Sequence, residues 1–131
     1  MALILVLLFF TFEGKTIEPY KSYNKLSISD NNQVFESVEI YLLYFKKKKF
    51  DNLHFINSKI IGLYGQGLKF TNFKAAQTTF KGAKLAGSNF KNCELSHVTF
   101  IDSDLSFSNI NKCKLSNVTY INTIQYEISN F

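Results

Sequence analysis

Large apolar residues return every five positions along most of the chain. Between Phe50 and Tyr120 only Gly65 and Ala75 interrupt the pattern with small side chains. The fifteen positions are Phe50, Phe55, Ile60, Gly65, Phe70, Ala75, Phe80, Leu85, Phe90, Leu95, Phe100, Leu105, Ile110, Leu115 and Tyr120. A period of five fits neither an α-helix, with 3.6 residues per turn, nor a flat strand with a period of two. A fixed period of this kind predicts a repeat architecture.

A second position in each five supports the same architecture. Two residues before each large side chain the chain prefers a small or apolar residue, such as Ser58, Ala83 or Val98. The other three positions are mostly Lys, Asn, Asp, Ser, Thr and Gly. Two inward and three outward residues in every five suit a chain that turns a corner at each pentapeptide.

Several of these pentapeptides resemble the repeats of the pentapeptide-repeat family. The stretches that carry the resemblance are Ala83-Lys84-Leu85, Ser88-Asn89-Phe90, Cys93-Glu94-Leu95, Ser103-Asp104-Leu105 and Ser108-Asn109-Ile110. The family motif is Ala, then Asp or Asn, then Leu or Phe, then two free residues. The resemblance implies an all-β fold, a right-handed quadrilateral parallel β-helix in which four pentapeptides form the four sides of each coil.

In such a coil, residues twenty apart stack on the same side. The aromatic residues then gather in two columns and the aliphatic residues in two others, which allows dense packing of a narrow interior. Asn52, Asn72 and Asn92 form an outward ladder at the same spacing. The expected structural core is Phe70, Phe80, Leu85, Phe90, Leu95, Phe100, Leu105, Ile110, Leu115 and Tyr120.

Three segments follow from this pattern: an N-terminal segment over 1–49, a β-helix of about four coils over 50–125, and a tail over 126–131. The tail is too short for a capping helix, so the last coil is expected to present an unpaired strand edge. We therefore expect an end-to-end homodimer through the C-terminal coil. The alternative is that the sequence is a fragment that lacks its cap.

The N-terminal segment admits several interpretations. Residues Met1–Phe12 are apolar apart from Thr11, and they fit a cap over the first coil, a signal segment or part of a longer membrane segment. Lys15–Gln33 is polar and is predicted to be a loop or linker. Val34–Phe45 has helical spacing, which favours a helix or an extended segment covering the solenoid, although its five-residue register also fits a degenerate coil. Such a coil would place Lys48 at an inward position, and burial of its charge would cost free energy.

The charge changes the expected function. The net charge is +5, and all fifteen basic residues are lysines. Some family members are acidic, DNA-shaped decoys that bind type II topoisomerases such as gyrase, and a basic coil imitates a polyanion poorly. Nucleic-acid binding is also disfavoured, because scattered lysines lack the forked geometry of arginine. The Lys46–Lys49 run is interpreted as a solvated helix end or loop, with binding of phosphates or of an anionic membrane surface as the alternative.

The residues capable of chemistry are few. Cys93 and Cys113 are twenty apart at inward positions, and we expect two reduced thiols there, although a disulfide is within reach. His54 and His97 lie far apart, so no metal or cofactor site is expected, and no catalytic motif is present. Positive φ angles are expected at the glycines, which fall at repeat corners: Gly62, Gly65, Gly67, Gly82 and Gly87.

The sequence therefore predicts a non-catalytic scaffold or protein-interaction module with an unidentified protein partner. The candidate interaction patch consists of Ile61, Ile101, Phe107 and Ile121. A membrane-associated or exported effector-type protein, using residues 1–12, is the alternative, and a gyrase-binding DNA mimic is a weaker one. A cytoplasmic location is favoured, with membrane association and secretion left open.

Overall fold

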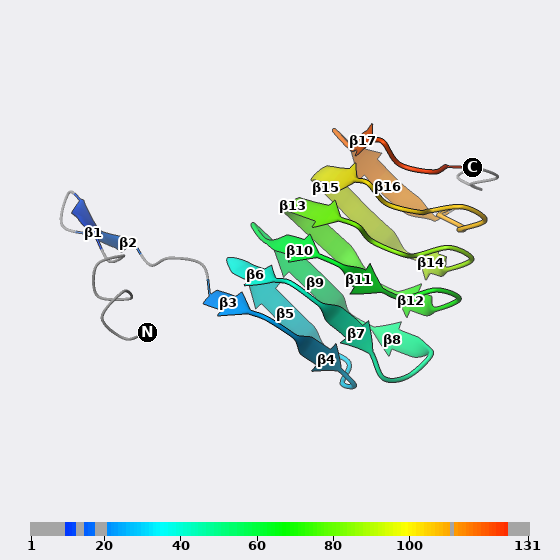
Figure 1. The fold of residues 1–131 in the computed structure, drawn as a ribbon, viewed down its shortest axis with the longest axis horizontal. Helices are drawn as coiled ribbons and strands as arrows, with labels where there is room; N and C mark the ends of the chain where they lie inside the picture. The colour runs from blue at the N-terminus through cyan, green and yellow to red at the C-terminus, as the bar shows by residue number, and fades with distance from the viewer. Residues whose placement is uncertain (1–9, 13–14, 18–20, 111, 126–131) are drawn as a thin grey trace.

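The chain folds into a β-solenoid (Figure 1). The computed structural model describes residues 10–12, 15–17, 21–110 and 112–125, and within these residues it contains strands and no helix. The strands are β1 (Phe10–Phe12), β2 (Lys15–Ile17), β3 (Lys21–Tyr23), β4 (Leu26–Ile28), β5 (Gln33–Glu36), β6 (Val38–Ile40), β7 (Leu43–Phe45), β8 (Lys49–Asp51), β9 (Leu53–Ile56), β10 (Lys59–Ile61), β11 (Leu63–Tyr64), β12 (Lys69–Thr71), β13 (Lys74–Lys81), β14 (Asn89–Lys91), β15 (Cys93–Ile101), β16 (Cys113–Ser116) and β17 (Thr119–Ile121). Strands β1 and β2 pair antiparallel, and all the other strand pairs are parallel.

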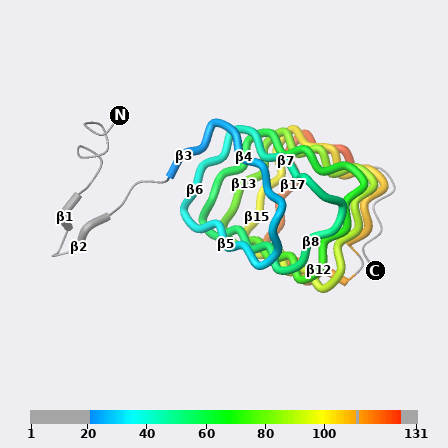
Figure 2. Tube along the Cα trace, turned by 90° about the horizontal axis from the view of Figure 1, so that it is seen from below, coloured from blue at the N-terminus to red at the C-terminus, as the bar shows by residue number. Residues whose placement is uncertain are grey.

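The coils have four sides, as the sequence predicts (Figure 2). We name each side after one of its strands. The β6 side contains β3, β6, β10, the second halves of β13 and β15, and β17. The β7 side contains β4, β7 and β11. The β8 side contains β8, β12 and β14. The β9 side contains β5, β9, the first halves of β13 and β15, and β16. Each turn of the solenoid contributes one of these strand segments, so the solenoid has about five turns.

The extra turn corrects the prediction for Val34–Phe45. A helix over these residues is wrong, because they form β5, β6 and β7, as the degenerate-coil alternative has it. Val38, Ile40 and Leu43 occupy inward positions and are at most 5% exposed. Lys48 is exposed, so its charge carries no burial cost. The interpretations of Met1–Phe12 as cap, signal or membrane segment fall mostly outside the described residues.

The first coil is shorter than the others. Strand β5 pairs with β9 at a spacing of twenty residues, Phe35 opposite Phe55. Strand β4 pairs with β7 at a spacing of seventeen, with Leu26 opposite Leu43. The shortened coil contributes no strand to the β8 side, so β8 is the edge strand there.

Left-handed backbone forms the corners. Every fifth residue from 52 to 107, and again 117 and 122, has a positive φ, each two positions after a residue of the five-residue apolar series. These residues are Asn52, Asn57, Gly62, Gly67, Asn72, Gln77, Gly82, Gly87, Asn92, His97, Asp102, Phe107, Asn117 and Asn122. Asn and Gly dominate because they tolerate this conformation best. The corner residues also pair between coils, since the Asn52 amide donates to Asn32 Oδ1 at 2.7 Å.

Gly65 is an exception to the corner rule. It has no positive φ and takes an inward position instead. A Cβ atom there would lie 2.9 Å from Leu68 Cδ1 and 3.2 Å from the Phe45 ring. The missing side chain therefore makes room for Phe45, and the expectation of positive φ at Gly65 is wrong.

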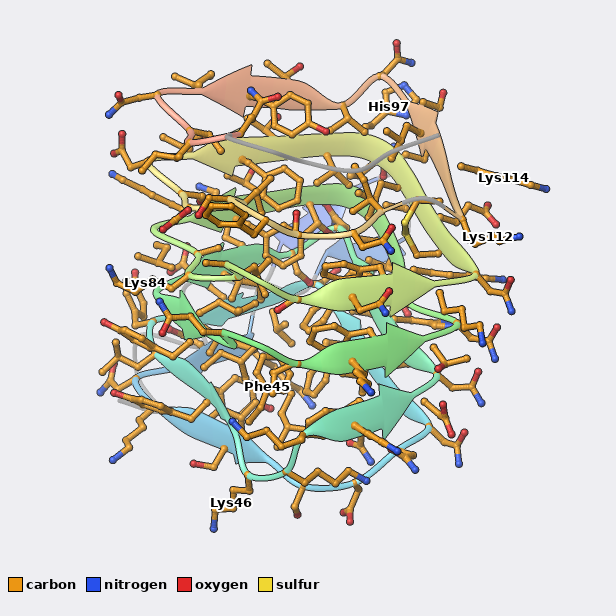
Figure 3. All side chains as sticks on the ribbon, turned by 90° about the vertical axis from the view of Figure 1, so that its right-hand side faces the viewer. Phe45, Lys46, Lys84, His97, Lys112 and Lys114 are labelled. Carbon is orange, nitrogen blue, oxygen red and sulfur yellow. A yellow bond between two sulfur atoms is a disulfide. The ribbon has the colours of Figure 1, made fainter. Side chains whose placement is uncertain are left out.

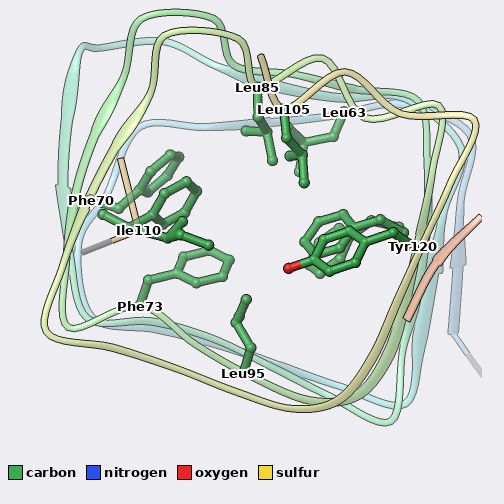
Figure 4. A pocket seen from close by; sticks show the side chains of 11 residues that line it. Leu63, Phe70, Phe73, Leu85, Leu95, Leu105, Ile110 and Tyr120 are labelled. Carbon is green, nitrogen blue, oxygen red and sulfur yellow. The ribbon is translucent and has the colours of Figure 1, made fainter. Parts of the chain in front are cut away.

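The interior is a set of aromatic and aliphatic columns (Figure 4). Phe70 stacks on Phe90 with ring centroids 4.9 Å apart, and Phe80 stacks on Phe100 at 5.4 Å. Eight of the ten expected core residues are at most 7% exposed: Phe70, Phe80, Leu85, Phe90, Leu95, Phe100, Leu105 and Ile110. Leu115 is 40% exposed and Tyr120 is half-buried, because both lie in the last coil.

Candidate interaction surfaces

The buried polar side chains serve the backbone of the coils. The Ser88 hydroxyl donates to the Gly65 carbonyl at 2.7 Å and accepts from the Leu68 N–H at 3.3 Å. Ser103 bridges two coils in the same way, accepting from the Ala83 N–H at 3.0 Å. Among the described residues every buried side-chain polar atom has a hydrogen-bond partner. These hydroxyls therefore stabilise the stacking of neighbouring coils.

The interior cavity is too small for a substrate. It measures about 20 Å³ and lies between the facing columns of Phe70 and Tyr120 (Figure 4). Its walls are apolar, including Leu85 and Leu105. A volume of this size is close to one water molecule, and an apolar cavity tends to stay dry.

Cys93 and Cys113 form a disulfide. The two residues are opposite each other in the β15–β16 pair, and their Cα atoms are 4.4 Å apart. The expectation of two reduced thiols is therefore wrong, because the parallel register brings the two inward side chains together in neighbouring coils. The bond joins the last coil to the one before it.

The candidate patch is divided in the structure. Ile61, Ile101 and Ile121 share one column on the β6 side, but Lys81 occupies the place between the first two. Ile121 is 49% exposed, whereas Ile61 and Ile101 are half-buried. Phe107 is 58% exposed and lies at the corner between the β7 and β8 sides. The four residues do not form one continuous surface.

A surface groove along the β7 side carries charges of both signs. Lys81 and Lys84 line it together with Asp102 and Asp104. The side-chain hydroxyl of Ser106 donates to Asp104 Oδ1 at 2.6 Å and its N–H does so at 2.9 Å. These two hydrogen bonds lower the pKa of Asp104. Neighbouring opposite charges give this groove no strong preference for a charged ligand.

The last coil is the least covered part of the solenoid. Leu115 is 40% exposed, Ile121 49% and Ile124 54%. Strands β16 and β17 each pair with β15 alone, so their other edges have no strand partner among the described residues. The Tyr120 ring stacks on Phe100 at 5.7 Å, and burial raises the pKa of its hydroxyl.

The histidines lie on the outside of the coils. His97 occupies a left-handed corner, with Nε2 3.0 Å from the Asn117 amide nitrogen and Nδ1 3.1 Å from Ser96 Oγ. His54 is half-buried in β9. The described residues include no group of three or more His, Cys, Asp or Glu side chains suited to a metal ion.

None of the described segments forms a helix with the length and apolar character required to cross a bilayer.

Parallel coils of four pentapeptides, with inward residues at two positions in five, define a β-solenoid of the quadrilateral class. Residues 78–117 match the profile of the family described as pentapeptide repeats, in eight copies. This part of the chain therefore consists of pentapeptide repeats, and it lies within a parallel β-solenoid. No curated protein matches the chain significantly.

Proposed function

We propose that this protein is a rigid interaction module that forms a homodimer through its C-terminal coil. Proteins of this repeat class are generally structural or interaction proteins without catalytic activity. The observation that carries the proposal is the exposure of apolar side chains in the last coil, beside strand edges that have no strand partner among the described residues. Such an edge is a ready template for another chain.

The chemistry of the last coil suits a second copy of itself. Leu115 occupies the same inward column as Leu95, which is buried in the coil before it. A partner chain that covered Leu115 would therefore extend the hydrophobic core. Tyr120 likewise presents the ring face that is not stacked on Phe100. A symmetric contact would bury both residues in each protomer at once.

Light scattering after size-exclusion chromatography tests the proposal. The wild-type protein is expected to elute as a dimer, and Leu115→Glu as a monomer because the charge would be buried at the contact. Val34→Glu is the matched control, since Val34 is 60% exposed in β5 at the other end of the solenoid. A monomeric wild type, or equal loss of the dimer in both variants, would contradict the proposal.

The disulfide supports a second candidate function, that of an exported or surface-associated protein. Disulfides persist in oxidising compartments and are rare in a reducing cytosol. The bond between Cys93 and Cys113 therefore suits an extracytoplasmic setting. Fusion of the full chain to an alkaline phosphatase reporter, which is active only after export, should give activity; an inactive fusion at normal expression would exclude this candidate.

A further inference from the structure

We propose that the β8 side binds the surface of an anionic phospholipid bilayer. This surface is independent of the C-terminal coil used in the function proposed above. It consists of β8, β12 and β14 with the bends that precede them, and Figure 3 views it directly.

Lysines are concentrated on this side. Five exposed lysines project from it, against Asp51 in β8 and the exposed Asp30 in the segment that hydrogen-bonds along β8. These lysines are Lys46, Lys48, Lys49, Lys69 and Lys91. Lys112 adds a charge at the neighbouring corner (Figure 3). The β7 and β9 sides, by contrast, mix both signs, as Lys84 with Asp104 and Lys74 with Glu94 illustrate.

The arrangement of these lysines is unfavourable in the protein alone. Lys49 and Lys69 are directly opposite each other in the β8–β12 pair. Like charges at directly opposite positions destabilise a sheet. An anionic surface placed over the strands would remove this repulsion, so the structure contains a charge pattern that a polyanionic partner would complement.

Protection of a strand edge explains only part of the pattern. Lysines on an exposed edge strand prevent pairing with other chains, and β8 is such an edge. This accounts for Lys48 and Lys49. Because β14 is the other edge strand of this sheet, the same reason applies to Lys91, but it does not account for Lys69 in the central strand β12.

Lys47 has a separate structural role. Its ammonium donates to Asn31 Oδ1 at 2.9 Å and lies 4.9 Å from the centre of the Phe50 ring. The side chain therefore covers the end of the core, and we do not count it in the binding surface.

Phe107 gives the surface an apolar anchor. It directly precedes the segment of the β8 side that contains Asn109, which pairs with Asn89 of β14. Its φ is 58°, in a column where Gly67 and Gly87 take the equivalent corners. A bulky side chain is strained in this conformation, yet the ring is 58% exposed. An exposed aromatic ring beside these lysines is suited to enter the interfacial region of a bilayer.

A lipid surface fits these observations better than nucleic acid. The strands form a flat wall with lysines as point charges, and the chain has no arginine to grip phosphates in a fork. In the described residues the strands of this side present no outward aromatic row on which bases could stack. Lysines combined with one inserted ring are the two signals that interfacial binding requires.

Vesicle sedimentation with the full chain tests this proposal. Vesicles of phosphatidylcholine with about one third phosphatidylserine should bind the wild type, and binding should weaken as salt rises. The triple variant Lys49→Gln, Lys69→Gln, Lys91→Gln should lose about 100-fold in partition coefficient, since each lysine near such a surface contributes about fivefold.

The matched control removes the same charge from the opposite side. Lys21→Gln, Lys59→Gln, Lys81→Gln changes three exposed lysines of the β6 side and should leave binding within about threefold of wild type. Equal losses in the two triple variants would show that only net charge matters and would overturn the proposal.

A second variant tests the anchor without risk to the fold. Phe107→Gly places at this corner the residue already found in the same column, and it should weaken binding about tenfold while keeping the circular dichroism spectrum. Three outcomes would refute a lipid-binding β8 side. The first is that the wild type binds neutral phosphatidylcholine vesicles as strongly as anionic ones, and the second is that it does not bind anionic vesicles. The third is that it binds a DNA duplex more tightly than anionic vesicles and that the triple lysine variant of the β8 side abolishes this DNA binding.

Discussion

Replacing Phe70 with alanine should remove a large part of the stability of the solenoid. The ring is 2% exposed and lies between two stacked neighbours, Phe50 at 6.2 Å and Phe90 at 4.9 Å. It also meets Phe45 and Phe73 edge-on, at 5.4 and 5.3 Å. Truncation of a buried phenylalanine costs about 3–5 kcal/mol, and four aromatic contacts favour the upper half of this range.

The architecture limits how far the cavity can collapse. Each coil is fixed by hydrogen bonds to the coils on both sides, for example from the Asn72 N–H to the Lys91 carbonyl at 2.9 Å. We therefore expect a loss of about 4 kcal/mol, from a total that is about 5–15 kcal/mol in proteins of this kind. The melting temperature should fall by about 15 °C.

Urea unfolding followed by far-ultraviolet circular dichroism measures this loss. Phe107→Ala is the control, because its ring is 58% exposed, and it should change the free energy of unfolding by less than about 1 kcal/mol. A double-mutant cycle adds a sharper test. Phe70→Ala and Phe90→Ala should couple by about 1 kcal/mol as stacked neighbours, whereas Phe70→Ala and Phe100→Ala, from different columns, should be nearly additive.

The result that would refute this reasoning is a loss below about 1 kcal/mol for Phe70→Ala, or equal coupling in the two cycles. The first would mean that the column does not support the fold. The second would mean that the interior behaves as one unsorted core and that stacking between coils has no special weight.

Three further changes test other parts of the structure. Cys113→Ser leaves Cys93 without its disulfide partner and should lower the free energy of unfolding by about 3 kcal/mol, because the disulfide joins residues with a sequence separation of 20. An unchanged urea midpoint when reductant is added to the wild-type protein would contradict this. Gly87→Ala should cost about 1 kcal/mol through its φ of 70° alone, since a Cβ atom meets nothing within 4 Å, and Gly87→Asn should cost less in the same unfolding assay. The hydrogen bonds from Ser106 lower the pKa of Asp104 in the folded protein. The stabilisation of the fold by these bonds is therefore present above the unfolded pKa, near 4, and is lost as the pH falls through the lower pKa of the folded state. Urea midpoints measured at neutral pH and near pH 3 should differ less in Asp104→Asn than in the wild type.

The regular coils were predictable because their information is local. The large residues from Phe50 onward repeat at a fixed spacing, and the same arithmetic places residues twenty apart in one column. The first coil was not predictable in this way. Its register is seventeen residues, so Leu26 and Ile28 fall outside the series, and helical spacing in Val34–Phe45 competes with it. Only the pairing of this segment with the next coil decides between a helix and a coil of the solenoid.

The corners and surfaces show a similar division. Asn72 and Gly82 indicate left-handed corners by residue type, but Gly65 carries no mark that distinguishes an inward glycine from a corner one. Its role depends on where the Phe45 ring goes, which is a tertiary fact. The opposition of Lys49 and Lys69, by contrast, follows from the twenty-residue spacing once the columns are known.

The redox state of the cysteines lay beyond the sequence for a different reason. A spacing of twenty residues brings Cys93 and Cys113 within reach of each other, but reach alone does not decide between a bond and two thiols. The structure gives the bond, with the Cα atoms 4.4 Å apart.

The short first coil makes the two ends of the solenoid unequal, and this sets a limit on assembly. Because the first coil pairs at a spacing of seventeen residues on the β6 and β7 sides and the last coil pairs at twenty, the two outlines do not match. Head-to-tail stacking, which would propagate without end, is therefore mismatched. A symmetric contact between two last coils, as in the proposed homodimer, would join equal outlines. If the proposed dimer forms, the three residues missing from one turn would disfavour its extension into a head-to-tail fibre.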